Sequence, residues 1–190
     1  MKVINTNIED VKIFQPKTFE DERGYFMETF RNDFISQETG RHINFCQDNE
    51  SKSKKGTIRG LHYQMPPYTQ TKLVRVISGK VLDIAVDIRK GSKSFGKYIA
   101  VELDSTLKQQ LYIPRGFAHG FIVLSEEAIF SYKVDNYYNQ KSERGIIYND
   151  NFLSIDWKLE KELFKLSDKD ILLPTFEKSE FFNIDKDLYR

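Results

Sequence analysis

Apolar and polar residues alternate in short runs along most of this chain, and residues that favour turns separate the runs. In residues 25–30, for example, Phe26, Glu28 and Phe30 fall on one face, as in a half-buried β-strand. The other runs that predict strands are 44–49, 73–77, 81–88, 99–103, 111–113, 117–124 and 128–134. The turn Ser78-Gly79-Lys80 between two of them predicts a hairpin.

Little of the chain has a helical pattern. Residues 32–39 predict one short helix that ends at Gly40, because glycine readily adopts the left-handed conformation that closes helices. From Glu160 onward the sequence is mixed and charged, and its apolar residues near 163–166 indicate a helical turn. We expect residues 177–190 to form a peripheral tail.

Many short strands without a regular alternation of strands and helices favour an all-β jelly-roll sandwich over an α/β fold. The length of 190 residues is that of one ordinary domain, so we expect a single domain over 1–190. The aromatic content of 14% supports this prediction, because aromatic side chains pack well on pleated sheets.

Charge and cysteine usage narrow the possible functions. Lysine and arginine total 29 against 28 acidic residues, and the absence of a long basic run argues against nucleic-acid binding. Cys46 is the only cysteine, which excludes an intrachain disulfide. The first residues lack the apolar core of a signal peptide, and no run reaches the roughly 18 apolar residues of a membrane span. We therefore expect a soluble, cytoplasmic protein with no membrane contact.

Two of the three histidines lie in apolar, strand-like sequence. His62 lies in the segment 59–64 and His119 in the segment 113–121, whereas His42 lies in polar surroundings and is expected at the surface. An imidazole among apolar residues needs a hydrogen-bond partner or a chemical role. Proton transfer is therefore the first functional hypothesis.

The glycine after Arg59 bears on the same hypothesis. Strict alternation would place Arg59 and His62 on opposite faces of a strand. A β-bulge at Gly60 would bring both side chains to the same face. The corresponding Arg-Gly pairs at Arg115 and Arg144 fit ordinary turn glycines beside solvated arginines equally well.

The spacing Pro114-x-Gly116-x-x-His119 resembles the second motif of the cupin superfamily, whose members are small jelly-roll barrels. In metal-binding cupins the first motif carries a His-x-His pair, but His62-Tyr63-Gln64 lacks the second histidine. Three or four good ligands are needed for stable binding of a divalent metal. We therefore expect no catalytic metal.

Further motifs narrow this resemblance to the dTDP-4-dehydrorhamnose 3,5-epimerase family. They lie in register from about residue 11 to 174, at 23–28, 47–49, 59–64, 72–75, around His119, at Tyr132 and Tyr138, and at 167–170. The resemblance implies a cofactor-free epimerase acting on dTDP-4-dehydro-6-deoxyglucose in dTDP-rhamnose formation. It also implies a homodimer that exchanges N-terminal strands.

The implied reaction explains the residue types. A ketone at C4 acidifies the hydrogens on C3 and C5, so inversion needs a base on one face of the sugar, an acid on the other, and stabilisation of the enolate. His62 is the candidate base, because an imidazole is largely neutral near pH 7 yet basic enough to act. Lys72 is the candidate for stabilising the enolate, and Tyr132 is the candidate acid because its phenol stays protonated. Taken singly, Lys72 also fits a solvated strand residue and Tyr132 a core tyrosine.

The resemblance also assigns partners and binding residues. It makes Asp170 the hydrogen-bond partner of His62, with Asp168 as the substitute if the loop is offset. Arg23, Arg59 and Lys169 suit the diphosphate, since guanidinium groups match phosphate oxygens well. Tyr138 is expected to stack on the base. The other implied contact residues are Phe26, Glu28, Gln47, Asp48, Asn49, His119 and Glu143, and Lys72 also contacts the substrate.

Three alternatives remain open from the sequence. An epimerase that inverts only C3, or a 3,4-ketoisomerase of another nucleotide-linked 4-keto sugar, would use a histidine base in the same barrel. A metal-dependent cupin enzyme would lose activity on chelation. A non-catalytic cupin would bind the sugar nucleotide without exchanging its protons.

Overall fold

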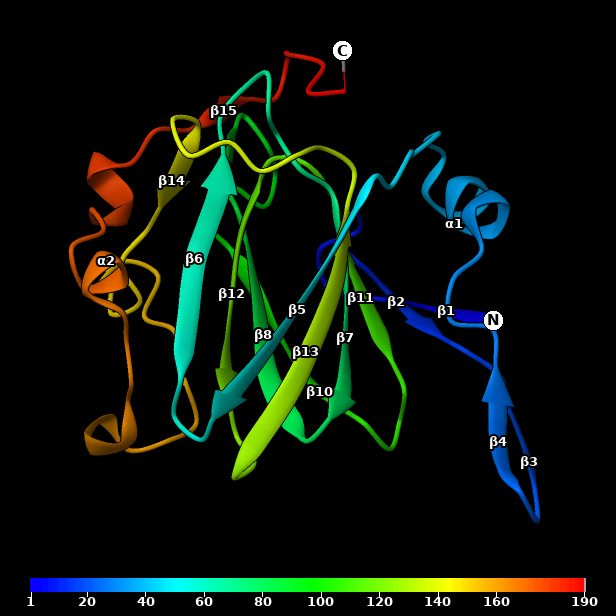
Figure 1. The fold of residues 1–190 in the computed structure, drawn as a ribbon. Helices are drawn as coiled ribbons and strands as arrows, with labels where there is room; N and C mark the ends of the chain where they lie inside the picture. The colour runs from blue at the N-terminus through cyan, green and yellow to red at the C-terminus, as the bar shows by residue number, and fades with distance from the viewer. Residues whose placement is uncertain (190) are drawn as a thin grey trace.

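Antiparallel sheets face each other across the core of the molecule, as Figure 1 shows for a computed structural model that describes residues 1–189. The first sheet has the strand order β1 (Lys2–Asn5), β2 (Lys12–Gln15), β11 (Gln110–Ile113), β7 (Lys72–Ser78), β13 (Glu127–Val134) and β5 (Gln47–Lys54). The second has the order β10 (Tyr98–Asp104), β8 (Lys80–Asp87), β12 (Phe117–Val123), β6 (Ile58–Gln64) and β14 (Glu143–Gly145). This arrangement confirms the predicted all-β jelly-roll class.

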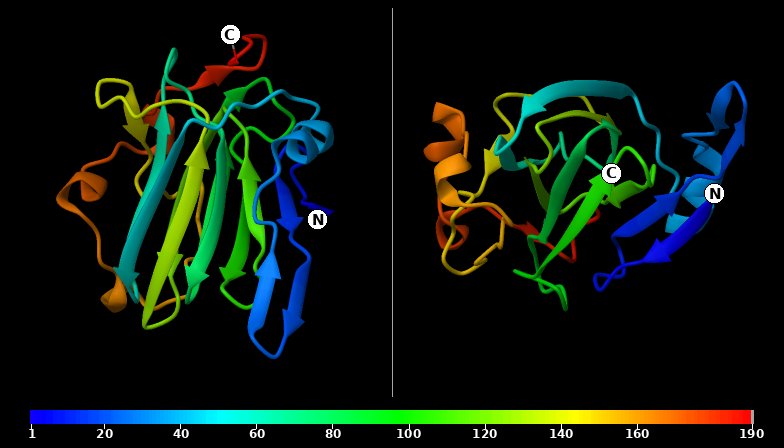
Figure 2. Two further views of the ribbon diagram at one scale, coloured as in Figure 1. Left: turned by 45° about the vertical axis from the view of Figure 1, so that its right-hand side comes forward. Right: turned by 90° about the horizontal axis from the view of Figure 1, so that it is seen from below.

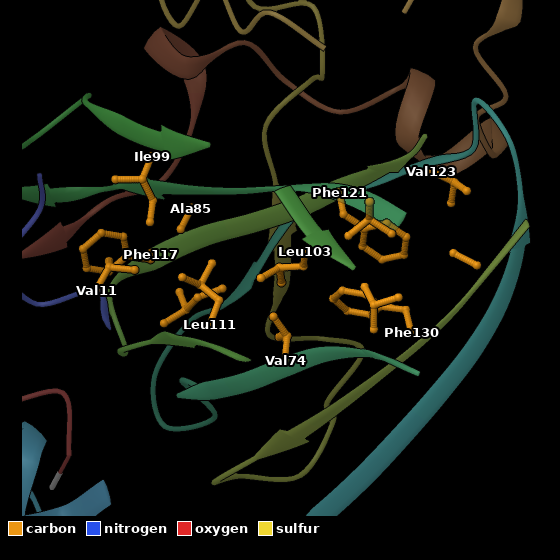
Figure 3. Packing of buried hydrophobic residues seen from close by; sticks show 14 of the residues in the cluster. Val11, Val74, Ala85, Ile99, Leu103, Leu111, Phe117, Phe121, Val123 and Phe130 are labelled. Atoms are coloured by element: carbon orange, nitrogen blue, oxygen red, sulfur yellow. The ribbon is translucent and has the colours of Figure 1, made fainter. Parts of the chain in front are cut away.

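The inner faces of the two sheets form one apolar core. Figure 3 shows its side chains converging between the strands, among them Val74 from β7, Ala85 from β8 and Leu103 from β10. At one end of this core the rings of Phe121 and Phe130 stack with their centroids 4.2 Å apart. Phe121 lies on β12 and Phe130 on β13, which belong to opposite sheets, so the stacked rings join the two sheets. Both rings also line the cavity described below.

The chain after β14 packs on the outer face of the second sheet. It contains η1 (Lys161–Leu163), α2 (Asp168–Ile171), η2 (Phe176–Lys178) and β15 (Phe182–Asn183), which pairs in parallel with β9 (Arg89–Lys90). Trp157, Phe176 and Phe182 are buried there against apolar residues of the sheet. Residues 177–189 thus contribute a strand and buried side chains to this layer, and Figure 1 shows them crossing one end of the barrel.

A hairpin near the N-terminus projects from the barrel. It consists of β3 (Thr18–Asp21) and β4 (Gly24–Met27), and both views in Figure 2 show it standing away from the two sheets. Phe19, Tyr25 and Phe26 are exposed on it, with Phe26 at 71%. We call residues 18–28 the arm.

The predicted helix is confirmed, because α1 spans Asn32–Thr39 and Gly40 follows it in the left-handed conformation. The predicted hairpin at Ser78-Gly79-Lys80 is wrong. β7 pairs with β11 and β13, whereas β8 pairs with β10 and β12, so the chain changes sheet at Gly79. A short turn between two apolar runs has the same sequence pattern in both cases, because only the partners of each strand distinguish a hairpin from a corner.

Among residues 1–189, no helix is long and apolar enough to span a membrane.

Candidate active site

A cavity of about 490 Å³ opens between the two sheets, and a second of about 270 Å³ adjoins it. His62, Lys72 and Tyr132 line both cavities. The three side chains come from β6, β7 and β13, so the two sheets each contribute to the junction. The candidate base, the candidate acid and the candidate enolate stabiliser are therefore brought together, although they are far apart in the sequence.

A β-bulge in β6 brings Arg59 and His62 to the same side. His62 lies opposite His119 on β12 and Arg59 lies opposite Phe121, so two residues of β6 face one residue of β12. Gly60 has a φ of +125°, and a Cβ there would lie 2.5 Å from the Cα of Gly120. Both Arg59 and His62 line the larger cavity, as the predicted bulge requires.

His62 forms a dyad with Asp170. Its Nε2 lies 2.6 Å from Oδ1 of Asp170, whose side chain is 5% exposed. Asp170 belongs to α2, and its backbone N–H donates to the side chain of Ser167 at the helix start. Burial raises the pKa of Asp170, but the hydrogen bond and charge of His62 outweigh this and lower it below its usual value. Asp168 is exposed and is not required as the substitute partner.

Tyr132 lines the cavity from the opposite sheet. Burial raises the pKa of its phenol, only partly offset by the nearby charge of Arg59. The phenol therefore remains protonated at neutral pH and can donate a proton.

Lys72 and His119 lie beside a buried carboxylate. Nε2 of His119 is 3.0 Å from both carboxylate oxygens of Asp83, which is fully buried. Burial lowers the pKa of Lys72 to about 8, while the charges of Asp83 and Glu143 hold it up. Burial also lowers the pKa of His119, despite its contact with Asp83.

Asp83 is a site residue that we did not predict from the sequence. The available signal was a carboxylate within the otherwise apolar run 81–86, where a charged group requires a partner. Its position on β8 places it behind His119 and Lys72, because β8 pairs with β12.

Polar groups suited to recognition line the smaller cavity. The hydroxyl of Tyr138 donates to Oε2 of Glu143 at 2.7 Å, and Nζ of Lys169 lies 2.5 Å from Oε1 of the same carboxylate. Burial raises the pKa of Glu143, but the bonds from Lys169 and Tyr138 lower it overall. Gln47 and Asn49 extend from β5 into this cavity and bond each other at 2.8 Å. The exposed ring of Tyr138 is free to stack on a planar group.

Four of the expected binding residues do not line these cavities. Arg23, Phe26 and Glu28 lie on the arm, away from the junction. Asp48 points to the other face of β5 from its neighbours Gln47 and Asn49, and its carboxylate pairs with Lys133. Alternation along the strand explains this placement of Asp48.

The described residues, 1–189, hold no group of three or more metal-ligating side chains close enough to share an ion. His42 is exposed and lies outside the site, as expected.

Comparison with known proteins agrees with this geometry. A family model described as dTDP-4-dehydrorhamnose 3,5-epimerase matches residues 5–178. A relative of that name from Shigella flexneri is 53% identical over 182 residues, which cover 96% of this chain and 99% of the relative.

Two solved structures are also closely similar. The dTDP-4-dehydrorhamnose 3,5-epimerase from Elizabethkingia anophelis NUHP1 has a TM-score of 0.90 and 49% identity, over 93% of this chain and 97% of the other. The dTDP-6-deoxy-D-glucose-3,5-epimerase RmlC from Legionella pneumophila Philadelphia 1, solved with dTDP-4-keto-L-rhamnose, has a TM-score of 0.93 and 44% identity, over 97% and 99%. The family match over most of the chain and these similarities together show that the chain belongs to the dTDP-4-dehydrorhamnose 3,5-epimerase family.

Proposed function

We propose that this chain inverts C3 and C5 of dTDP-4-dehydro-6-deoxy-D-glucose to give dTDP-4-dehydro-L-rhamnose, with His62 as base and Tyr132 as acid. Family membership supports the activity and its place in dTDP-rhamnose biosynthesis. The observation that carries the assignment of roles is that His62 and Tyr132 line one cavity from opposite sheets. Inversion requires proton removal on one face of the sugar and return on the other.

The first step is removal of a proton from carbon. Because the carboxylate of Asp170 accepts the hydrogen bond of Nε2, the lone pair of Nδ1 on His62 is the basic site. Nδ1 takes the proton from C3 or C5, the C–H electron pair forms a carbon–carbon double bond, and the C4 carbonyl becomes an enolate. Asp170 stabilises the resulting imidazolium. The ammonium of Lys72 stabilises the enolate oxygen.

The second step returns a proton to the opposite face. The hydroxyl of Tyr132 protonates the carbon, the C4 carbonyl re-forms, and the phenolate regains a proton from solvent while His62 releases its own. Repetition at the other carbon completes the reaction, and the atoms balance without a cofactor.

The binding roles follow the two cavities. Lys72 and His119 would contact the sugar, and Arg59 and Lys169 the diphosphate, because they line the larger cavity. Gln47, Asn49, Tyr138 and Glu143 would hold the nucleoside in the smaller one. Asp48 would contact the nucleoside only through its backbone, since its side chain pairs with Lys133.

The arm supports the proposal of a homodimer. Its exposed aromatic residues require a covering surface, and Arg23, Phe26 and Glu28 do not line their own chain's cavities. We assign these residues to the site of a partner subunit. The lone cysteine, Cys46, suits a reaction in the cytoplasm.

Counting exchanged hydrogens tests the proposal. The enzyme is incubated with the 4-keto substrate in D₂O, and mass spectrometry locates the deuterium. Deuterium at both C3 and C5, with L-rhamno product, is expected. Exchange at C3 alone would instead support a 3-epimerase. Formation of a 3-keto product would support a ketoisomerase, and nucleotide binding without exchange would support a non-catalytic cupin.

A further inference from the structure

Leu188 and Tyr189 form hydrogen bonds with residues that lie directly before Lys72, the first residue of β7. The backbone carbonyl of Leu188 accepts hydrogen bonds from Thr69 Oγ1 at 3.0 Å and from Arg115 Nη1 at 2.7 Å. The hydroxyl of Tyr189 accepts a hydrogen bond from Thr71 Oγ1 at 3.0 Å. Thr69 and Thr71 are 1% and 0% exposed, so these are bonds of the interior and not of the surface.

The ring of Tyr189 is held by two arginines. The guanidinium of Arg41 lies 4.5 Å from its centroid, and that of Arg115 lies 4.9 Å from it. Cation–π contacts of this kind gain strength where water is excluded. The backbone N–H of Arg115 also donates to the Tyr189 hydroxyl at 3.2 Å. This bond holds the ring against the segment that connects β11 to β12.

Arg115 also connects this group of residues to Asp135, which directly follows β13. Arg115 pairs with Asp135 at 3.0 Å, and the other carboxylate oxygen of Asp135 accepts the backbone N–H of Thr71 at 2.6 Å. The N–H of Asp135 donates back to the carbonyl of Thr71 at 3.3 Å. Lys72 follows Thr71 directly and pairs with Val134. The end of the chain is therefore connected to Lys72 through one buried residue.

Leu188 and Tyr189 lie outside the segment that the family model matches, which is residues 5–178. The catalytic steps proposed above do not use them. The hydrogen bond that Thr71, the neighbour of Lys72, donates to Tyr189 is therefore a contact that neither the matched family segment nor the mechanism accounts for.

We propose that Leu188 and Tyr189 form a latch that positions Lys72 for enolate stabilisation, acting through Thr71. The proposal rests on the role assigned to Lys72 under the proposed function. Leu188 and Tyr189 are positioning residues, since they line neither of the two cavities. Small displacements of a group that stabilises developing charge reduce the rate of chemistry more than they reduce ground-state binding.

The test compares Tyr189→Ala, Tyr189→Phe, Thr71→Val, Thr71→Ser and the double variant Tyr189→Phe with Thr71→Val in the full chain. For each variant, kcat and KM for the sugar nucleotide, the Kd for thymidine diphosphate and the Tm are measured, with kinetics well below the lowest Tm. Lys186→Ala is the matched control, because Lys186 is an exposed residue of the same terminal segment.

Tyr189→Ala is expected to lower kcat about tenfold while the Kd for thymidine diphosphate stays within about twofold, because misplacement affects the transition state most. Thr71→Val removes the hydrogen bond from Thr71 to Tyr189 and is expected to lower kcat about threefold. Tyr189→Phe removes that bond and also the one from the Arg115 N–H, so its kcat is expected to fall at least as far, and the double variant no further than Tyr189→Phe alone. Thr71→Ser retains the hydroxyl and is expected to keep the native kcat, as is Lys186→Ala.

The latch is overturned by a native kcat in Tyr189→Ala, by losses that multiply in the double variant, or by a loss that only follows the fraction unfolded. Lys72→Ala separates this failure from failure of the proposed function. If Lys72→Ala retains full turnover, the role of Lys72 is wrong whatever Tyr189 does. If Lys72→Ala is impaired and the Tyr189 variants are native, only the latch is wrong.

Discussion

At the scale of single residues, the same side chain acquires different properties from its surroundings. His62 is 27% exposed at its side chain, bonds one oxygen of Asp170 through Nε2 and lines the cavity. His119 is 7% exposed and rests on both oxygens of Asp83. Burial lowers the pKa of His119. Of the two imidazoles, His62 is therefore suited to take up and release protons, and His119 to hold a fixed position.

His62→Ala removes the proposed base. Turnover is expected to fall about a hundredfold or more, since a positioned base contributes at least that much. The Kd for thymidine diphosphate, measured by calorimetry, is expected to stay native because the proposed function gives the nucleotide contacts to other residues, namely Arg59 and Lys169 for the diphosphate and Gln47, Asn49, Tyr138 and Glu143 for the nucleoside. His42→Ala, at an exposed histidine, is the control and should match the native enzyme. Full turnover in His62→Ala would contradict the role of base.

Tyr132→Phe removes the proposed acid but leaves the base in place. Abstraction of the substrate proton, followed as loss of label from a C5-deuterated substrate, is expected to continue. Formation of epimerised product is expected to fall, because the opposite face lacks its donor. An equal fall in both measurements would show that Tyr132 does not act as the acid.

If Lys72 stabilises the enolate as proposed, it is expected to set an upper pH limit for the reaction. Burial lowers the pKa of Lys72 to about 8, from an ordinary value of 10.5. The ammonium is therefore present below pH 8 and is lost as the pH rises through it, so kcat is expected to decline above about pH 8. Lys72→Arg keeps its charge at all these pH values and is expected to abolish the decline, at a lower rate set by its different shape. A decline that persists in Lys72→Arg would assign the limit to another group.

At the scale of secondary structure elements, the sequence predicted individual strands better than their partners. The bulge in β6 was predictable, because a glycine inside an apolar strand weakens the strand unless a bulge or a close backbone approach requires it. The sheet change at Gly79 was not, because strand pairing depends on contacts with β10, β11, β12 and β13, remote in sequence. Likewise, motifs identified His62 and Lys72, but nothing local connected them to Asp83.

Gly60→Ala tests the bulge. An alanine there would have a left-handed φ of +125° and a Cβ 2.5 Å from the Cα of Gly120, so we expect a loss of about 2–4 kcal/mol in the free energy of unfolding. Gly24→Ala is the matched control, because its φ is +124° but nothing lies within 4 Å of a Cβ. Its loss should be smaller. Equal losses in urea denaturation would mean that the close approach to β12 is not what requires glycine.

At the scale of the whole molecule, the distribution of site residues predicts cooperation between subunits. Arg59, His62 and Tyr132 lie in the barrel, whereas Arg23 lies on the projecting arm. If the arm completes the partner's site, then a chain with a substitution in the arm and a chain with a substitution at His62 should together form a dimer that contains one intact site. Composition and periodicity contain no information on this point, because they describe only a single chain.

Mixing Arg23→Ala with His62→Ala tests this arrangement. In a mixed dimer, the Arg23→Ala chain keeps its own His62 and receives an intact arm, so one of its two sites is native. Random exchange makes half of the dimers mixed, and the expected activity is about a quarter of the native value. Mixtures no more active than the sum of the separate variants, or a monomer in analytical ultracentrifugation, would refute the shared site.

The dyad joins His62 and Asp170, which are 108 positions apart in the chain. Asp170 lies on α2, whereas every strand of the two large sheets ends by residue 145. During synthesis, the ribosome has therefore released the complete barrel before the carboxylate emerges. The imidazole of His62 is therefore without its hydrogen-bond partner until residues after the barrel strands have been made. If the dyad acts as proposed, a chain that ends before Asp170 is expected to bind the sugar nucleotide but to turn it over poorly.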